Sequence, residues 1–231
     1  MKQKNKKLIQ NIFTAVGVLL VAAGIFVVML PKITNYIYDK NVDRQVTQFE
    51  ADTADNSLDR LYAELQKRNK ELYENKQNGL VDPFSYSQPD IDLSAYGLKN
   101  NTIGFLYIPA MELNIPILLG ANEGNMAQGA AHLTNTSYPI GGTNTNAVLA
   151  AHRGFSKAKM FRHIEVLKKG DKVYIKNFRE TLTYEVFDTE VITPTEVDKL
   201  KIRDGEDMVT LITCHPYRHN YQRYLVFCRR V

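Results

Sequence analysis

Cys214 is the first residue whose position suggests chemistry. It closes the run MVTLITC, and a proline-containing stretch, HPYRHNYQ, separates it from the next apolar run. A thiol at the end of a strand lies on the rim of a fold, where a substrate can reach it. Free cysteine is also among the most buried residue types, so the alternative is a structural thiol. A thiol becomes an effective nucleophile beside a base or a cation. The positions of the histidines and arginines therefore decide between a reactive and a structural thiol.

His152 is the histidine best placed to serve as that base. It closes the strand-like run AVLAAH and is followed by Arg153 and Gly154, a turn that could open a cleft. His215 follows Cys214 directly, so in an extended chain it points to the opposite face. We expect the other three to be structural, in helical or loop contexts: His132, His163 and His219.

Arg223 could supply the positive charge that such a reaction needs. When a thiolate attacks a carbonyl, the oxyanion requires a fixed donor, and a guanidinium offers a permanent charge with several N–H groups. The alternative is a surface arginine on an edge strand, and spacing alone does not decide between the two. Cys228 lies five residues after Arg223. Because this offset is odd, a regular strand points the two to opposite faces, and we expect Cys228 to be a structural free thiol.

These candidates lie in a series of short β-type runs that begins near Ile103. Gly, Pro, Asn and Asp separate the runs IGFLYIP, LNIPILLG, AVLAAH, DKVYIKN, LTYEVFDTEVI, MVTLITC and RYLVFCR. This pattern predicts a mainly β fold, a compact barrel or sandwich of about 130 residues. Short helical pieces are expected near residues 122–130 and 156–168.

Composition and charge exclude several classes of protein. The chain has 231 residues, 44% hydrophobic and 23% charged, which excludes a disordered tail, a collagen-like fibre and a disulfide-stapled miniprotein. All of the net charge of +4 comes from four lysines in residues 1–11, and a neutral body argues against nucleic-acid binding. There is no CxxC or Cys/His cluster at zinc spacing, so we expect no metal and no organic cofactor.

The N-terminal region predicts a membrane anchor. Residues 12–30, IFTAVGVLLVAAGIFVVML, carry no charge over a length that crosses about 30 Å of hydrocarbon as a helix. The preceding lysines place residues 1–11 in the cytoplasm and everything after the span outside the cell. The alternative is a cleaved signal peptide, whose apolar region is shorter, roughly 7 to 15 residues. We expect a retained, single-pass anchor in the cell membrane.

Two further segments separate this anchor from the β-rich body. Residues 31–76 form a predicted helical stalk, because apolar residues recur at three-to-four-residue spacing from residue 35 onward. The stalk would pack on the domain, and the alternative is a helix that binds a partner. Residues 77–100 contain several helix-breaking Gly and Pro residues and are predicted to be a long loop, which in compact proteins is often functional.

Three separated motifs resemble the sortases, membrane-anchored cysteine transpeptidases of Gram-positive bacteria. TLITC at residues 210–214 is similar to the family's TLxTC nucleophile motif, AHRG at 151–154 carries the family histidine, and Arg223 follows the cysteine by nine residues. The resemblance covers residues 104–231. It implies a closed eight-stranded barrel at residues 101–231, with His152, Cys214 and Arg223 as catalytic residues.

Within the family, CHPYRHNYQR resembles the CxPYxxNxxR pattern of the pilus-building class C enzymes. Asp82, Pro83 and Phe84 fall where class C enzymes carry a lid. The resemblance implies that Asp82 pairs with Arg223 and that Phe84 covers Cys214. Without it, this triplet would be an ordinary turn.

The resemblance also implies a reaction. Cys214 would attack the Thr-Gly bond of an LPxTG-like signal on a pilin or surface protein, Arg223 would stabilise the oxyanion, and His152 would protonate the leaving amine. A lysine of a second pilin would then resolve the thioacyl enzyme. One alternative is a housekeeping sortase that attaches proteins to the peptidoglycan cross-bridge. The other is a non-catalytic scaffold that presents pilins.

Overall fold

A computed structural model describes residues 2–54, 58–98, 101–154 and 158–231, and eight strands follow two long helices in this part of the chain. The strands are β1 (Thr102–Ile108), β2 (Leu113–Leu119), β3 (Ala130–His132), β4 (Thr145–Ala150), β5 (Lys172–Asn177), β6 (Thr181–Ile192), β7 (Asp207–His215) and β8 (Gln222–Arg230). The α-helices are α1 (Lys2–Thr53), α2 (Asp59–Glu74) and the short α3 (Glu123–Met126).

The strands close into a barrel in the order β1-β2-β3-β4-β7-β8-β6-β5. The pairs β2/β3 and β4/β7 are parallel, and the other neighbours are antiparallel. Closure leaves no open sheet edge, which removes a site for unwanted strand pairing. The predicted mainly β fold and the closed eight-stranded barrel are confirmed.

Both faces of β7 are buried, and they face two different hydrophobic clusters. Val209 and Leu211 belong to the main core cluster, whereas Met208 and Ile212 belong to a second cluster. Successive residues of a strand point to opposite faces, so the second cluster covers the other face of β7. Residues of this second face continue toward Cys214, so the candidate site extends from a packed surface.

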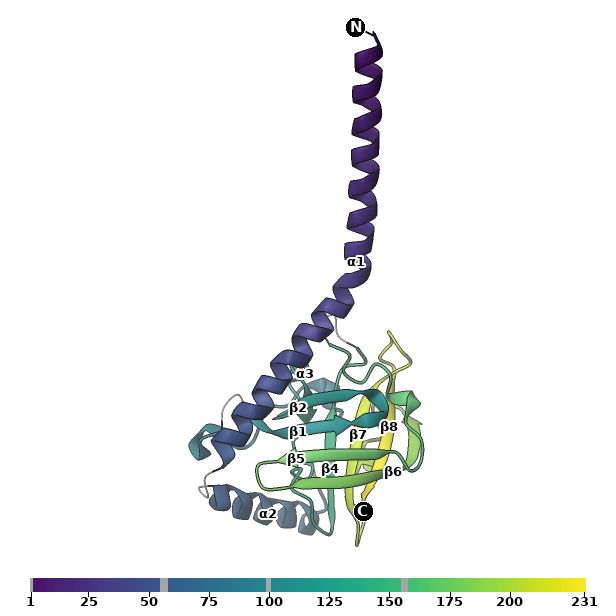
Figure 1. Cartoon of the computed structure of the whole chain (residues 1–231). Helices are drawn as coiled ribbons and strands as arrows, with labels where there is room; N and C mark the ends of the chain where they lie inside the picture. Colours follow the sequence, from purple (N-terminus) through teal and green to yellow (C-terminus); the bar gives the residue numbers. More distant parts are fainter. Residues whose placement is uncertain (1, 55–57, 99–100, 155–157) are drawn as a thin grey trace.

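The two long helices pack on the barrel (Figure 1). Val42 and Phe49 of α1 are buried, and the Phe49 ring lies edge-on to Phe105 of β1 with 5.5 Å between ring centroids. Leu61 and Leu65 of α2 are fully buried in the same core cluster. The amphipathic pattern of the stalk is therefore used for packing. The apolar residues 12–30 of α1 project away from the barrel and are exposed.

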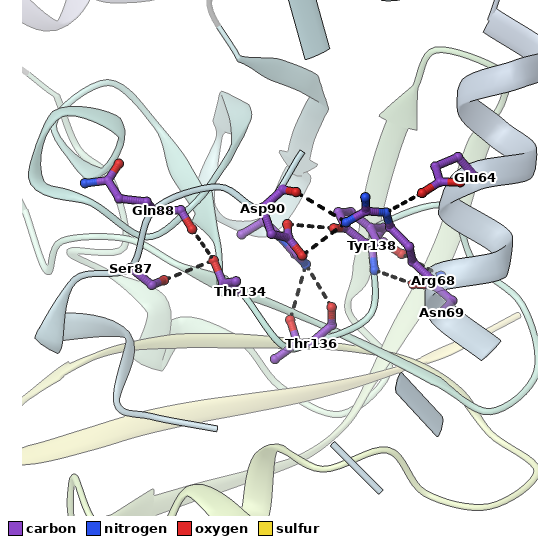
Figure 2. A network of polar contacts seen from close by, with 10 residues as sticks. Glu64, Arg68, Asn69, Ser87, Gln88, Asp90, Thr134, Thr136 and Tyr138 are labelled. Carbon is purple, nitrogen blue, oxygen red and sulfur yellow. Dashed lines mark hydrogen bonds and ion pairs between the residues drawn. The ribbon is translucent and has the colours of Figure 1, made fainter. Parts of the chain in front are cut away.

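A polar network joins α2, the 77–100 segment and the β3–β4 loop (Figure 2). Asn69 of α2 donates its Nδ2 to the Tyr138 carbonyl (3.3 Å) and accepts the Tyr138 backbone N–H at its Oδ1 (2.7 Å). The Tyr138 hydroxyl donates to Asp90 Oδ1 (2.7 Å), and Arg68 lies 3.6 Å from Asp90 Oδ2. Because the buried amide of Asn69 is paired on both sides, its position is specific and fixes α2 against the loop.

The segment 77–100 contains two short 3-10 turns within its described residues, η2 (Pro83–Ser85) and η3 (Leu93–Tyr96). Strand β3 was not among the predicted runs, because three residues are too few to show an alternating pattern. Of the two expected helical pieces, the first is reduced to α3 and the second to the turn η5 (Ile164–Val166). Residues 156 and 157 of the second piece lie outside the described residues.

Leu65→Ala tests the packing of α2. Leu65 is fully buried, so we expect the free energy of unfolding to fall by roughly 2–5 kcal/mol, from lost burial and a residual cavity. Urea unfolding of the full chain in detergent, followed by near-ultraviolet circular dichroism, measures this. Lys67→Ala on the exposed face of the same helix is the control, with an expected change below about 0.5 kcal/mol. Identical unfolding midpoints for the two variants would contradict the packing.

Candidate active site

The pairing of β7 with β8 brings Cys214 and Arg223 together. The antiparallel register sets Cys214 directly opposite Arg223. Directly opposite residues of an antiparallel pair project from the same face, with Cβ atoms about 5 Å apart. Cys214 is partly exposed, and Arg223 is buried. A thiol and a guanidinium thus share one face at the end of the barrel.

His152 reaches the same rim from β4, the strand parallel to β7. The Ala151 backbone N–H donates to the Ile212 carbonyl oxygen (3.2 Å), and Thr213 Oγ1 donates to the Ala151 carbonyl (2.7 Å). The parallel register of β4 with β7, continued beyond the strand end, sets His152 beside Cys214. Neighbouring strands lie about 4.8 Å apart, so the backbones of His152 and Cys214 run side by side at one rim of the barrel.

The protonation equilibria favour a neutral pair in this conformation. Burial raises the pKa of the Cys214 thiol; the charges of Arg223 and Arg153 oppose this rise, and Asp82 adds to it. Burial also lowers the pKa of His152, with a partial opposing effect from Glu123. A raised thiol pKa and a lowered imidazole pKa both favour the uncharged forms.

Asp82 binds the guanidinium of Arg223 with both carboxylate oxygens. Arg223 Nε donates to Asp82 Oδ1 (2.7 Å), and Nη2 donates to Oδ2 (2.6 Å). The side chain of Arg223 is only 6% exposed and that of Asp82 16%, so this bidentate pair is little screened by water. Arg223 Nη1 donates to the carbonyls of Asn220 (2.7 Å) and Gln222 (2.9 Å). Asp82 thus occupies the Nε and Nη2 donors of Arg223.

Phe84, two residues after Asp82, lies over the same site. The guanidinium carbon of Arg223 is 4.7 Å from the centre of the Phe84 ring. The rings of Phe84 and His152 are 6.3 Å apart between centroids. Phe84 also packs against the second hydrophobic cluster. Pro83 is buried between the two residues, so the Asp82–Pro83–Phe84 triplet covers the rim with both a charge and an apolar ring.

A second polar cluster, which the sequence did not predict, contacts the backbone of Cys214. Arg153 Nη1 donates to the Cys214 carbonyl (3.3 Å) and lies 2.8 Å from His215 Nδ1, while Nη2 lies 2.5 Å from Glu165 Oε2. Arg153 stands directly after His152 in AHRG, which was an available signal. Glu165 carried none, because only the fold brings η5 to this place. His215 lies on the face opposite Cys214, as the alternation predicts, and stacks on Tyr224 with ring centroids 5.8 Å apart.

The remaining histidines lie elsewhere. The expectation of a helical or loop context for His132 is wrong, because it ends strand β3. It is buried, with Nε2 3.2 Å from the Thr136 carbonyl and 3.0 Å from the Ser137 carbonyl. His163 precedes η5, and the ring of His219 lies beside that of Tyr221.

Cys228 occupies the opposite face of β8 from Arg223, as its odd offset predicts. It is fully buried in the main core cluster and is a free thiol. Burial raises its pKa strongly. Cys214 is therefore the only cysteine that a solvent-borne reagent can reach. Within the described part of the chain, no group of three or more His, Cys, Asp or Glu side chains could hold a metal ion.

A thiol, an imidazole and a guanidinium on the rim of a closed β-barrel define a cysteine-dependent acyl-transfer enzyme as the class of protein. The comparisons with known proteins agree with this class. The Sortase domain model matches residues 106–231. Sortase A of Bacillus anthracis is 34% identical over 158 residues, which cover 67% of this chain and 72% of that protein. The chain therefore belongs to the sortase family of cysteine transpeptidases.

Solved structures of sortases are similar over most of the chain. Sortase C1 of the group B Streptococcus pilus island 1 superposes with a TM-score of 0.74 at 32% identity, covering 82% of this chain and 91% of that one. A lid mutant of Streptococcus agalactiae Sortase C1 gives a TM-score of 0.72 at 32% identity, covering 80% and 96%. The structural similarity extends beyond the barrel, because 82% of the chain is more than the residues 106–231 that the family model matches.

Asp82→Ala tests the closure of the rim. The substitution removes the partner of Arg223 and a carboxylate that raises the pKa of Cys214. We expect iodoacetamide to alkylate Cys214 several-fold faster at neutral pH, with the rate–pH midpoint shifted downward. Mass spectrometry follows the modification. Gln88→Ala, an exposed change in the same segment, should leave the profile unchanged. Equal rates for Asp82→Ala and the unaltered chain would argue against a closed rim.

Arg153→Ala should act in the opposite direction. It removes a positive charge that lowers the pKa of Cys214 and a donor to the Cys214 carbonyl, so the alkylation midpoint should shift upward. Thermal unfolding controls for loss of the fold, because Arg153 is buried. Arg153→Lys keeps the charge without the planar fork and should give an intermediate shift. A folded Arg153→Ala protein with an unshifted profile would contradict this role.

Proposed function

We propose that this sortase cleaves an LPxTG-like sorting signal through Cys214 and transfers the acyl group to a lysine of a pilin. The observation that carries the proposal is the placement of Cys214, His152 and Arg223 on one rim under an Asp82–Phe84 lid. A thioester chemistry needs a nucleophile, a proton carrier and a fixed positive donor, and these three side chains match those needs.

The reaction begins when the lid leaves the rim. Release of Asp82 frees the Nε and Nη2 donors of Arg223 for a substrate carbonyl. The Cys214 sulfur attacks the threonine carbonyl carbon, its proton passes to His152, and Arg223 stabilises the oxyanion. The carbon–nitrogen bond to glycine then breaks, and His152 gives its proton to the departing amine. The products are a thioester on Cys214 and a released peptide whose N-terminal residue is the glycine.

A lysine amine of a second pilin completes the cycle. Its nitrogen attacks the thioester carbonyl carbon and gives a proton to His152. The carbon–sulfur bond then breaks, and His152 passes the proton to the sulfur, which restores the Cys214 thiol. The new bond is an isopeptide. Water competes for the same thioester, and a lid that closes over the rim favours the amine by limiting access of solvent.

The names of two similar structures support a pilin as the substrate and a lid over the active site. One is the Sortase C1 of a pilus island, and another is a lid mutant of a Sortase C1. In this chain the Asp82–Arg223 pair and the Phe84 ring give such a lid a physical basis. The curated relative from Bacillus anthracis is named Sortase A, which favours a second candidate, attachment of surface proteins to the peptidoglycan cross-bridge.

Membrane attachment is part of the proposed function. Within the described residues, α1 is long and apolar enough to cross a membrane. We propose that residues 12–30 are retained as a single-pass anchor, with residues 1–11 in the cytoplasm and the barrel outside. An anchored enzyme meets exported substrates while they are still held at the membrane.

Competition between two amines tests the choice of acceptor. The full chain in detergent is given an LPxTG-type peptide together with a lysine-bearing pilin domain and a cross-bridge peptide at equal concentrations. We expect the pilin isopeptide to dominate the products by mass spectrometry, and Cys214→Ala to give none. A product formed mainly on the cross-bridge peptide would favour the second candidate, and products from the Cys214→Ala chain would overturn the mechanism.

A further inference from the structure

The helix that carries the apolar segment is also part of the folded domain. α1 is continuous from Lys2 to Thr53, and its second half is packed on the barrel through Val42 and Phe49. Pro31 lies between the two halves, and α1 bends there before it runs on to the barrel (Figure 1), so the packed half fixes the place from which residues 12–30 leave the domain. If these residues span a bilayer, as proposed above, one end of the barrel must face that bilayer.

The part of α1 nearest to the apolar segment contacts elements that surround His152. The Tyr38 hydroxyl donates to the Gln128 carbonyl (2.6 Å), just beyond α3. Glu123 of α3 raises the pKa of His152, against the larger effect of burial. The membrane-proximal contact of α1 is therefore made beside the catalytic rim.

A second set of contacts gives the same direction. The charge of Lys159 lowers the pKa of Asp39, against the larger effect of burial. Lys159 belongs to the segment whose Phe161 backbone N–H donates to the His152 carbonyl (3.0 Å). Farther along α1, Glu50 pairs with Lys176 of β5, away from these elements. The order of contacts along α1 thus runs from the catalytic rim to the other side of the barrel.

The loop between β7 and β8, residues 216–221, lies at this same end. Figure 1 shows it in yellow on the side of the barrel toward which the apolar part of α1 runs, while the C-terminus lies at the opposite end. Two aromatic side chains of this loop are exposed, Tyr217 by 42% and Tyr221 by 59%. Arg218 lies between them and extends over the Tyr217 ring.

The part of α1 that contacts the barrel begins close to the proposed membrane surface. Leu30 and Tyr38 are separated by eight residues, which is about 12 Å along a helix at a rise of about 1.5 Å per residue. The headgroup layers add roughly 5–8 Å on each side of a hydrocarbon core about 30 Å thick. Tyrosine is enriched at such interfaces, because its ring is apolar and its hydroxyl is polar. Arginine is attracted to anionic headgroups.

We propose that residues 216–221 contact anionic lipid headgroups, so that the active-site rim opens toward the membrane that holds the anchor. This proposal rests on the proposed membrane anchor but not on the proposed chemistry. It assigns the β7–β8 loop a lipid-surface contact in addition to its place beside Cys214. Substrates would then enter the rim from the narrow space between the barrel and the bilayer.

The absence of tryptophan from the sequence gives a direct test. Tyr221→Trp places a single fluorophore on the loop, and Val231→Trp places one beyond the far end of β8. A nine-residue strand separates the two sites by about 30 Å. The full chain is inserted into nanodiscs of anionic lipid that contain a headgroup-attached nitroxide, which quenches tryptophan only at close range.

We expect several-fold stronger quenching of the Tyr221→Trp fluorophore than of the Val231→Trp fluorophore. Equal quenching, or stronger quenching at position 231, would overturn the proposal, and so would a chain that does not co-elute with the discs. Cleavage of a soluble LPxTG-type peptide by the same Tyr221→Trp protein is measured in parallel. A failure of the chemistry and a failure of the membrane orientation are thus distinguishable.

Discussion

The register between β7 and β8 is the constraint on which the site depends. It sets Cys214 opposite Arg223 and places Cys228 on the other face, inside the barrel. A slip of one residue would move every side chain of one strand to the wrong face, and the thiol and the guanidinium would separate. The two hydrophobic clusters on the two faces of β7 hold this register, because a slip would exchange their members. Packing of the barrel and the geometry of the site are therefore specified by the same contacts.

Electrostatics around Cys214 follow from two arginines that are each paired with a carboxylate. Arg223 is bound by Asp82, and Arg153 lies against Glu165. Both arginines lower the pKa of the thiol, yet burial outweighs them while the rim is closed. A neutral thiol reacts slowly with alkylating reagents, so burial protects Cys214 in this conformation. Asp82 adds to the rise in the thiol pKa, so removing its carboxylate from the rim would favour the thiolate.

Much of this arrangement could be predicted from the sequence, and the exceptions have physical causes. Short β-type runs separated by turn residues predicted β6, β7 and β8, and strand parity predicted the opposite faces of Arg223 and Cys228. The three-residue strand β3 was missed, and the expected context of His132 was therefore wrong. Arg153, Glu165 and His215 meet only because the turn before β5 folds back onto the end of β7, a tertiary contact that no local pattern encodes. The lid triplet gained a role only through resemblance to a family, since a short turn carries no periodic signal.

The most direct test of the account is the intact mass of the protein after exposure to an LPxTG-type peptide. The full chain with Asp82→Ala, which frees the rim, is incubated with the peptide in detergent without an added amine, beside the same chain that also carries Cys214→Ala. The account predicts a mass gain equal to the acyl fragment ending in threonine, absent from the Cys214→Ala chain. An unmodified Cys214 together with an intact peptide, or an adduct that persists without Cys214, would contradict it.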